Sequence, residues 1–206
     1  MKSLTKMDKF VLEIPNFMPK EVCASIIEKF EADDRKKHGY YYYDIGHRLV
    51  TRDKLNDELT ITDCPGWENL HQICVDHIHK AHNAYSNHLI ETFKEYNYDN
   101  HIYDRELNCK DISATGIPVQ RIGKGGLYAW HHDGDASRHF FIQALFYLNT
   151  LQENQGGCTE FIDGRKVRPE AGKVLVYPCS WTFPHTGTKV EYGYKYIWTT
   201  TISIQT

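Results

Sequence analysis

The sequence predicts a mostly β fold with flanking helices, in which an antiparallel barrel or jelly roll carries helices packed on one side. Two observations support this prediction. Two segments of the first 96 residues have apolar side chains at helical spacing. From Ile117 onward the chain changes to short runs rich in β-branched and aromatic residues, separated by Gly, Asn, Asp and Pro. Many short strands that follow two helices are typical of this architecture.

The composition predicts a single soluble domain. The chain has 206 residues, of which 41% are hydrophobic and 25% charged, and its formal net charge is -3. No basic block stands out, so we expect no nucleic-acid partner. The start of the chain lacks the apolar core of a signal peptide, and no apolar run approaches membrane-spanning length. The six cysteines are scattered without a Cys-x-x-Cys pair, which favours reduced thiols in the cytoplasm, or in the host cytoplasm if the chain is viral.

The first elements predicted are a short strand and a helix. Residues 10–14 alternate weakly and end at Pro15, which indicates a strand. Pro19 suits the first turn of a helix whose apolar stripe reaches Phe30. We expect residues 31–38 to form its solvated end and Gly39 to stop it. The tyrosine run at 40–43 that follows predicts a strand or loop that packs alternate rings on the core, with a substrate approach as the less favoured alternative.

The second helix is predicted over residues 66–96, after Pro65, and should lie against the outside of a sheet. We expect its five histidines to face solvent or the boundary of the core. His71 and Cys74 could share a metal, but further ligands for a closed site are not apparent. Residues 97–115 read as a connecting loop with at most one short element. The predicted strands after it are 118–122, 127–130, 140–148, 158–162, 173–177 and 195–204.

The residues around Trp130 carry the strongest chemical signal. In an extended strand, side chains two apart share a face, so His131 and Asp133 can converge on one ion while His132 points away. Two imidazoles and one carboxylate on one face form the 2-His-1-carboxylate arrangement of non-haem Fe(II) oxygenases. His185 is the best candidate for the third ligand, and His132 or His139 are alternatives.

Six landmarks in order, spanning about residues 117 to 204, carry a family resemblance. The chain resembles the Fe(II)- and 2-oxoglutarate-dependent oxygenases, most closely their prolyl 4-hydroxylase-like branch. That branch has a Gly-rich turn, Tyr-x-x-His-x-Asp, Ser-Arg before a strand ending Tyr-Leu-Asn, Gly-Gly-x-Thr-x-Phe, Pro-x-x-Gly, and His-x-Gly followed by Gly-x-Lys-Tyr. The matching positions here are Gly123 to Gly126, Tyr128 to Asp133, Ser137 to Asn149, Gly156 to Phe161, Pro169 to Gly172, His185 to Gly187 and Gly193 to Tyr196.

The resemblance implies a fold and a division of the chain. It sharpens the barrel to a cupin-like double-stranded β-helix whose open mouth holds the iron. Residues 1–206 would form one oxygenase domain, with 1–115 as an N-terminal helical support region and 116–206 as the catalytic core. The Gly-rich turn and residues 40–52 would form a wall that grips a peptide.

The resemblance also implies roles for residues. His131, Asp133 and His185 would bind Fe(II), and Lys195 would hold the distal carboxylate of 2-oxoglutarate. Tyr147 and Tyr128 are the candidates for a tyrosine hydroxyl beside that carboxylate. The family's Gly-rich turn usually follows a Tyr, but this chain has Ile122 there, so the second contact to the cosubstrate stays open, with Thr186 and Thr199 as substitutes. Trp130 and Arg138 are candidate substrate contacts, although tryptophans are more often core residues and Arg138 is as readily a partner for a loop carboxylate.

The activity implied is hydroxylation of a C–H bond, with dioxygen as co-reactant and release of succinate and CO2. The first expectation for the substrate is a prolyl residue in a peptide or protein, and ascorbate is a candidate further cofactor. The alternatives are hydroxylation of a free amino acid or other small molecule, a non-catalytic metal- or peptide-binding barrel, and a cupin-like metalloenzyme without 2-oxoglutarate, against which Lys195 counts. The pattern carries no prediction of oligomeric state.

Overall fold

The computed structural model describes residues 9–39, 41–45, 48–52, 56–96, 109, 112–134 and 140–204. Within these ranges two long helices, α1 (Lys20–Ala32) and α2 (Glu68–Glu95), accompany strands that pair antiparallel throughout. A one-turn 3-10 helix spans Glu153–Gln155. No helix of the described residues has the length and apolar character needed to cross a membrane.

The described strands form a large sheet, a smaller sheet and a hairpin. The eight-stranded sheet contains, in spatial order, β1 (Leu12–Ile14), β12 (Val174–Pro178), β9 (Phe140–Tyr147), β14 (Lys195–Ile204), β7 (Pro118–Ile122), β5 (Asn56–Thr60) and β2 (Lys37–His38), with β6 (Ile112–Ala114) paired to β14. The four-stranded sheet contains β11 (Lys166–Val167), β10 (Thr159–Phe161), β13 (His185–Gly187) and β8 (Tyr128–His131). The hairpin joins β3 (Tyr41–Ile45) to β4 (Arg48–Arg52).

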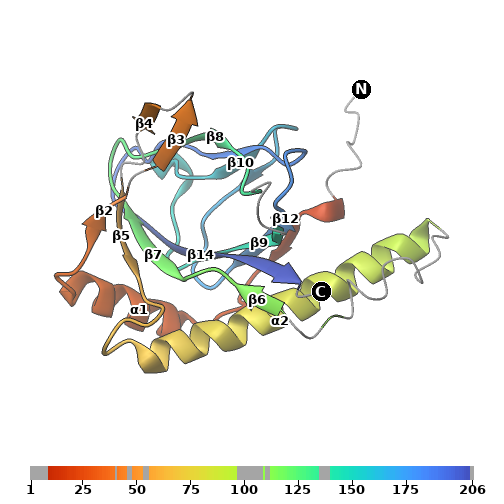
Figure 1. The fold of residues 1–206 in the computed structure, drawn as a ribbon, viewed down its shortest axis with the longest axis horizontal. Helices are drawn as coiled ribbons and strands as arrows, with labels where there is room; N and C mark the ends of the chain where they lie inside the picture. Colours follow the sequence, from red (N-terminus) through yellow and green to blue (C-terminus); the bar gives the residue numbers. More distant parts are fainter. Residues whose placement is uncertain are drawn as a thin grey trace.

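The large sheet separates two hydrophobic clusters because alternate residues of its strands face opposite sides. Trp198 belongs to the cluster that the helices cover, where it stacks on Phe146 with ring centroids 3.7 Å apart. Its neighbour Ile197 belongs to the cluster between the two sheets, together with Leu175 and Tyr177 of β12. In Figure 1 both helices lie along one side of the large sheet, and β8 and β10 lie on the other. The arrangement is the predicted double-stranded β-helix with helices packed on one side.

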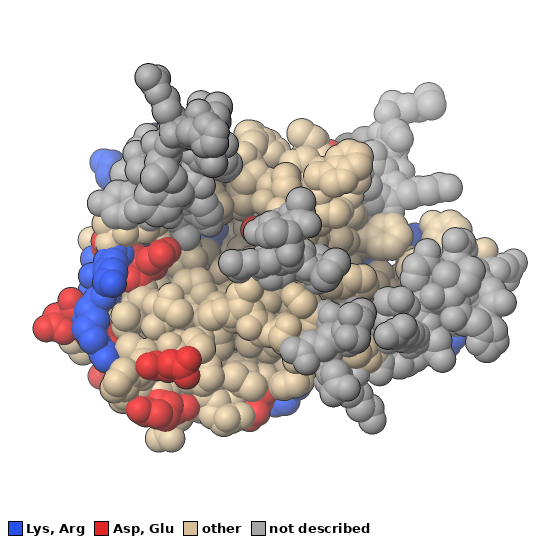
Figure 2. Space-filling view, viewed as in Figure 1, with Lys and Arg blue, Asp and Glu red and all other residues tan. Residues whose placement is uncertain are grey.

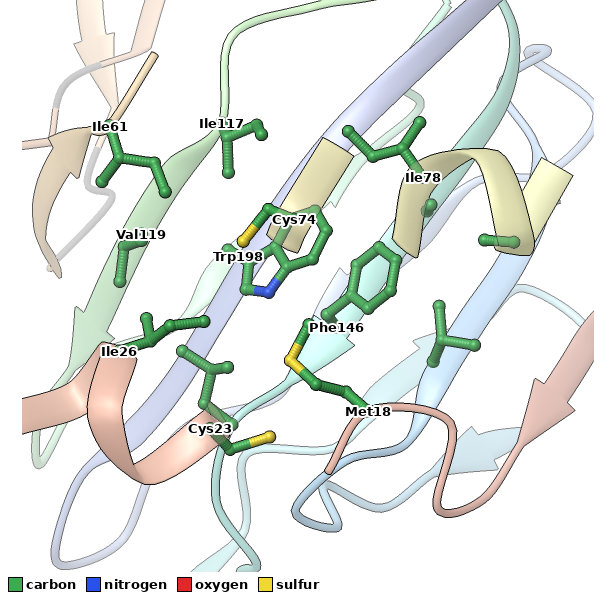
Figure 3. Close-up of a cluster of buried hydrophobic side chains, with 14 of the residues drawn as sticks. Met18, Cys23, Ile26, Ile61, Cys74, Ile78, Ile117, Val119, Phe146 and Trp198 are labelled. Carbon is green, nitrogen blue, oxygen red and sulfur yellow. The ribbon is translucent and has the colours of Figure 1, made fainter. Parts of the chain in front are cut away.

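The helices attach to the sheet through an apolar face and an ion-pair cluster. Figure 3 shows Cys23 and Ile26 of α1 and Cys74 and Ile78 of α2 around the stacked Trp198 and Phe146 rings. At the edge, Arg121 of β7 pairs with Glu31 of α1 at 2.8 Å and with Asp57 of β5 at 2.6 Å. Figure 2 shows basic side chains beside acidic ones at the left of the drawn face, and the described surface there has no broad basic area.

The first helix is shorter than predicted, and the strands β2, β4 and β5 that follow it were not predicted. Helix α1 ends at Ala32, because the Asp33 carboxylate accepts hydrogen bonds from the backbone N–H and side chain of Arg35 and from Trp67 Nε1. Lys36 Nζ then donates to the last helical carbonyls, those of Phe30 and Glu31. Residues 37–38 therefore form β2 against β5 instead of continuing the helix.

Helix α2 spans Glu68–Glu95, within two residues of the predicted 66–96 at each end. Its histidines, however, do not all face solvent or the boundary of the core. His77 and His82 are buried, with exposed fractions of 6% and 3%. His77 Nδ1 lies 2.7 Å from the carbonyl oxygen of Ile73, and burial lowers the pKa of His82. Trp181 is not a core residue either, since it is 76% exposed, whereas Trp198 is fully buried.

Three turn glycines have a left-handed backbone conformation. Gly156, Gly157 and Gly172 have φ of +69°, +72° and +83°, a region that residues with a Cβ rarely adopt. Of the tyrosine run, residues 41–43 lie in the strand β3 and Tyr40 lies outside the described residues.

Candidate metal centre

Strand pairing in the small sheet brings two histidines together. His131 is the last residue of β8 and His185 the first of β13, and the two are register partners with ring centroids 4.2 Å apart. His131 Nδ1 lies 2.7 Å from the carbonyl oxygen of Ala129, and His185 Nδ1 lies 3.2 Å from that of Phe183. A carbonyl oxygen only accepts, so each Nδ1 carries the donated hydrogen and each Nε2 keeps a lone pair for a metal.

Asp133 completes a three-residue cluster. Its Oδ1 lies 3.6 Å from His131 Nε2, and its Oδ2 lies 3.4 Å from His185 Nε2. Potential ligand atoms of the three residues lie within 4.8 Å of one another, and no other such group occurs among the described residues. Although β8 ends at His131, Asp133 still converges on it, while His132 is exposed. His139 lies outside the described residues, and the pair His71 and Cys74 gathers no further ligand within them.

Tyr177 is a member of the cluster that sequence reasoning missed. Its hydroxyl donates to Asp133 Oδ2 at 3.1 Å and lies 3.0 Å from His185 Nε2. It stands on β12 two residues after Leu175, with both side chains in the cluster between the sheets. The alternation of residues 174–178 could have placed this hydroxyl inside the barrel.

The electrostatics of the cluster suit a divalent ion. Burial lowers the pKa of His185 to about 4, so this imidazole is neutral at pH 7. Burial pushes the pKa of Asp133 upward, but the neighbouring imidazoles of His131 and His185 and the hydrogen bond from the Tyr177 hydroxyl together bring it below its ordinary value. Two imidazole nitrogens and one carboxylate oxygen on one side of a cavity form the donor set of non-haem Fe(II) sites with open positions.

Lys195 reaches the same cavity from β14. It is 4% exposed and pairs in register with Ile122, and both side chains line the cavity with the three cluster residues. No carboxylate lies within ion-pair distance of its Nζ among the described residues. Burial accordingly lowers its pKa to about 8. Its neighbours in the chain differ from it, since Tyr194 is exposed and Tyr196 packs partly buried against the cluster that the helices cover.

The two candidate tyrosines take different places. Tyr147 is fully buried, its ring centre lies 5.6 Å from Lys195 Nζ, and its hydroxyl shares a 2.7 Å hydrogen bond with Thr159, which lines the cavity. Tyr128 lines the cavity itself and stacks on His131 with ring centroids 3.5 Å apart.

Of the other expected site residues, some line the cavity and some do not. Thr199 lines the cavity, whereas Thr186 donates to the carbonyl oxygen of Tyr128 at 2.6 Å and does not line it. Trp130 is 50% exposed and precedes His131 on β8, so it does not line the cavity. Arg138 lies outside the described residues.

Comparison with known families gives one match. Residues 117–202 match the model of the family described as the 2OG-Fe(II) oxygenase superfamily. This range contains the three cluster residues, Tyr177 and Lys195. A comparison with curated proteins finds no match.

Solved structures share the fold at low sequence identity. A prolyl hydroxylase from Trichoplax adhaerens, in complex with a hypoxia inducible factor oxygen degradation domain peptide fragment, is 13% identical, with 95% of this chain and 84% of that chain covered and a TM-score of 0.68. A prolyl-4-hydroxylase from Pseudomonas putida is 16% identical over 96% and 94% of the two chains, with a TM-score of 0.64. A viral collagen prolyl hydroxylase from Paramecium Bursaria Chlorella virus-1, in a 2OG complex, is 15% identical over 98% and 100%, with a TM-score of 0.55.

Proposed function

We propose that this chain is a member of the 2OG-Fe(II) oxygenase superfamily, whose model matches residues 117–202, and that it is a dioxygenase that hydroxylates a prolyl residue of a peptide or protein and releases succinate and CO2. The observation that carries the proposal is the convergence of His131, Asp133 and His185 beside a buried lysine for which the described residues offer no anionic partner.

The three cluster residues would hold the Fe(II) ion. Their donor atoms lie on one side of the cavity. The described part of the chain adds no fourth ligand residue to these three, so coordination positions of the metal that face the cavity stay open. When bound, Fe(II) supplies the redox chemistry between dioxygen, 2-oxoglutarate and a C–H bond. Tyr128, which stacks on His131, fixes the plane of that imidazole.

Lys195 would hold the distal carboxylate of 2-oxoglutarate. A buried cation without a partner is unfavourable, and an anion that enters the cavity removes this cost while it gains a charge-assisted hydrogen bond. The hydrogen-bonded hydroxyls of Tyr147 and Thr159 lie near the ammonium and can complete the polar end of the cavity. The apolar side chain of Ile122 excludes water beside it.

A prolyl substrate in a peptide is supported by the kind of proteins that share the fold. One of them is a prolyl hydroxylase described with a bound peptide fragment, and two others are described as prolyl hydroxylases of bacterial and viral origin. Trp130, half exposed on β8 next to His131, is the described aromatic residue best placed to contact a substrate outside the cavity. Arg138 remains a candidate contact on sequence grounds, and ascorbate remains a candidate further cofactor.

The test is anaerobic reconstitution of the full chain with Fe(II), followed by 2-oxoglutarate. We expect a weak visible charge-transfer band, and after air is admitted we expect succinate, whose release proline-rich peptides stimulate. His131→Ala should lose the band and the succinate. His132→Ala is the matched control, because this adjacent histidine is exposed and is not a member of the cluster.

Each outcome separates the candidate functions. Bound iron without a band or succinate would refute the dioxygenase and favour a non-catalytic metal-binding barrel. Succinate that free proline stimulates better than any peptide would refute the peptide substrate and favour a small-molecule hydroxylase. Full turnover by His131→Ala at equal iron content would refute the ligand assignment.

A further inference from the structure

A polar groove meets the metal cluster on the inner face of the large sheet. It crosses β5, β7, β14 and β9, and its polar lining includes Glu58, Thr60, Gln120, Gln143, Thr199 and Thr201. Asp133, Gln120, Gln143 and Thr199 line both this groove and the cavity that contains Lys195. The groove and the cavity therefore meet at Asp133, with His131, His185 and Lys195 on the cavity side alone.

Two buried glutamines present hydrogen-bond donors to this groove. Gln120 and Gln143 are 5% and 6% exposed. The carboxamide oxygen of Gln120 accepts from Asn56 Nδ2 at 3.3 Å, and that of Gln143 accepts from Thr201 Oγ1 at 2.9 Å. These bonds orient each side chain with its NH2 group away from its neighbour, and no described group accepts a hydrogen bond from either Nε2. A ligand with acceptor oxygens would satisfy both.

The register of the sheet places the two glutamines at separate points along the groove. Gln120 pairs with Ile197 of β14, and Gln143 pairs with Thr201, four residues further along the same strand. Four residues of a strand span about 13 Å. An extended peptide of several residues spans an offset of this size between two points of its backbone.

The donors also match the chemistry of a prolyl peptide. A proline keeps its backbone carbonyl but has no N–H to donate. A groove that offers N–H donors at separated points can bind such a chain through its carbonyl oxygens without needing donors from it.

We propose that Gln120 and Gln143 are substrate-binding residues that donate to main-chain carbonyl oxygens of a peptide several residues long, which lies in this groove with its reacting residue at the metal cluster. The proposal rests on the proposed function for the identity of the reaction. It adds the binding surface, the donors and the minimum length of the substrate.

The test measures peptide affinity and cosubstrate affinity in the same samples. The anaerobic Fe(II) protein with 2-oxoglutarate is titrated into a fluorescein-labelled ten-residue oligo-L-proline peptide, and anisotropy gives the Kd. N-acetyl-L-proline N-methylamide, one capped residue, is the competitor that tests length. The charge-transfer band gives the 2-oxoglutarate Kd of each variant.

Two replacements at each glutamine distinguish the loss of its N–H donor from the loss of its whole carboxamide. Gln143→Met removes the carboxamide at nearly constant length, and Gln143→Glu keeps the acceptors while it loses the donor; the same pair is made at Gln120. We expect each variant to weaken peptide binding by about threefold to tenfold, the effect of one hydrogen bond, and the peptide Kd to rise by a larger factor than the 2-oxoglutarate Kd. Gln72→Met, on the exposed face of α2, is the control and should bind as the wild type does.

The outcomes distinguish this proposal from the proposed function. Peptide binding that survives unchanged in all four variants overturns the role of the glutamines. Failure of the wild type to bind the peptide, or a capped proline that competes as well as the peptide itself, overturns the extended groove. If the wild type shows neither the charge-transfer band nor succinate, the proposed dioxygenase function is refuted instead. The anisotropy titration still measures peptide binding to the groove in that case.

Discussion

Replacing Lys195 by Met should make the protein more stable while it removes cosubstrate binding. Lys195 is 4% exposed and has no anionic partner among the described residues, so the folded state carries the cost of a buried charge. Burial lowers its pKa from 10.5 to about 8. Since one pKa unit corresponds to about 1.4 kcal/mol, this difference is worth about 3 kcal/mol at pH 7.

The size and pH dependence of the effect follow from this pKa. For a chain of this length, about 3 kcal/mol corresponds to a rise in Tm of about 6 to 12 °C. A lysine whose folded-state pKa lies below its unfolded value destabilises fully below the folded pKa, and the cost disappears as the pH rises toward the unfolded value. The stability gap between Lys195→Met and the wild type should therefore be full at pH 7 and should narrow between about pH 8 and pH 10.5.

The assay is denaturant unfolding of metal-free protein across this pH range, with melting of the anaerobic Fe(II) protein with and without 2-oxoglutarate. The cosubstrate should raise the Tm of the wild type far more than that of Lys195→Met. Lys173→Met is the matched control, because Lys173 is equally buried but pairs with Glu13 at 3.2 Å and Glu170 at 2.7 Å. It should lose about 1 to 3 kcal/mol, the cost of leaving charged partners unsatisfied. A Lys195→Met protein less stable than the wild type at pH 7 would refute the reasoning.

Three further predictions concern the metal cluster, the core and a turn. Tyr177→Phe removes the hydroxyl that donates to Asp133, so the affinity for Co(II), measured by visible absorption, should fall about fivefold to a hundredfold. An unchanged affinity would show that this hydrogen bond does not orient the Asp133 carboxylate for the metal. Trp198→Ala should lower the free energy of unfolding by about 3 to 5 kcal/mol, measured with denaturant, whereas Trp181→Ala, at an exposed residue, should change it by no more than about 0.5 kcal/mol. Similar losses in the two variants would contradict the assignment of the core. Gly156→Ala should destabilise by about 1 to 3 kcal/mol, because its φ is +69° and a Cβ would lie 2.2 Å from a backbone oxygen; an unchanged Tm would contradict it.

The sequence predicted the parts of the fold that rest on apolar periodicity. The strands 118–122 and 195–204 have the predicted bounds, since their β-branched and aromatic residues alternate strongly. Strand β5, Asn-Asp-Glu-Leu-Thr, was missed because it is almost wholly polar; its pairing with β7, not its side chains, makes it a strand. The early end of α1 depends on hydrogen bonds to Asp33 from residues two and thirty-four positions away, which a local pattern does not contain.

In the candidate site, too, some residues could be predicted from local sequence patterns and others could not. His131, Asp133, His185 and Lys195 stand at landmark positions of a known family, and the structure brings them to one cavity. No landmark motif specifies Tyr177, Gln120 or Gln143, and only strand register shows that their side chains meet the cluster. The buried His77 and His82 could have been placed from sequence, because they fall at helical spacing with Cys74, Ile78 and Tyr85 in the buried face of α2.

The pairing of His131 with His185 also has a consequence for how the small sheet is aligned. Successive side chains of a strand point to opposite faces, so a slip of one residue between β8 and β13 would turn one imidazole away from the other. These strands are only four and three residues long, and their register already shifts between His185 and Gly187. An ion held by both imidazoles requires the alignment in which the two rings face each other. Metal binding would then act as a cross-strand clip that fixes the register of β13 and, through their pairing, of β10.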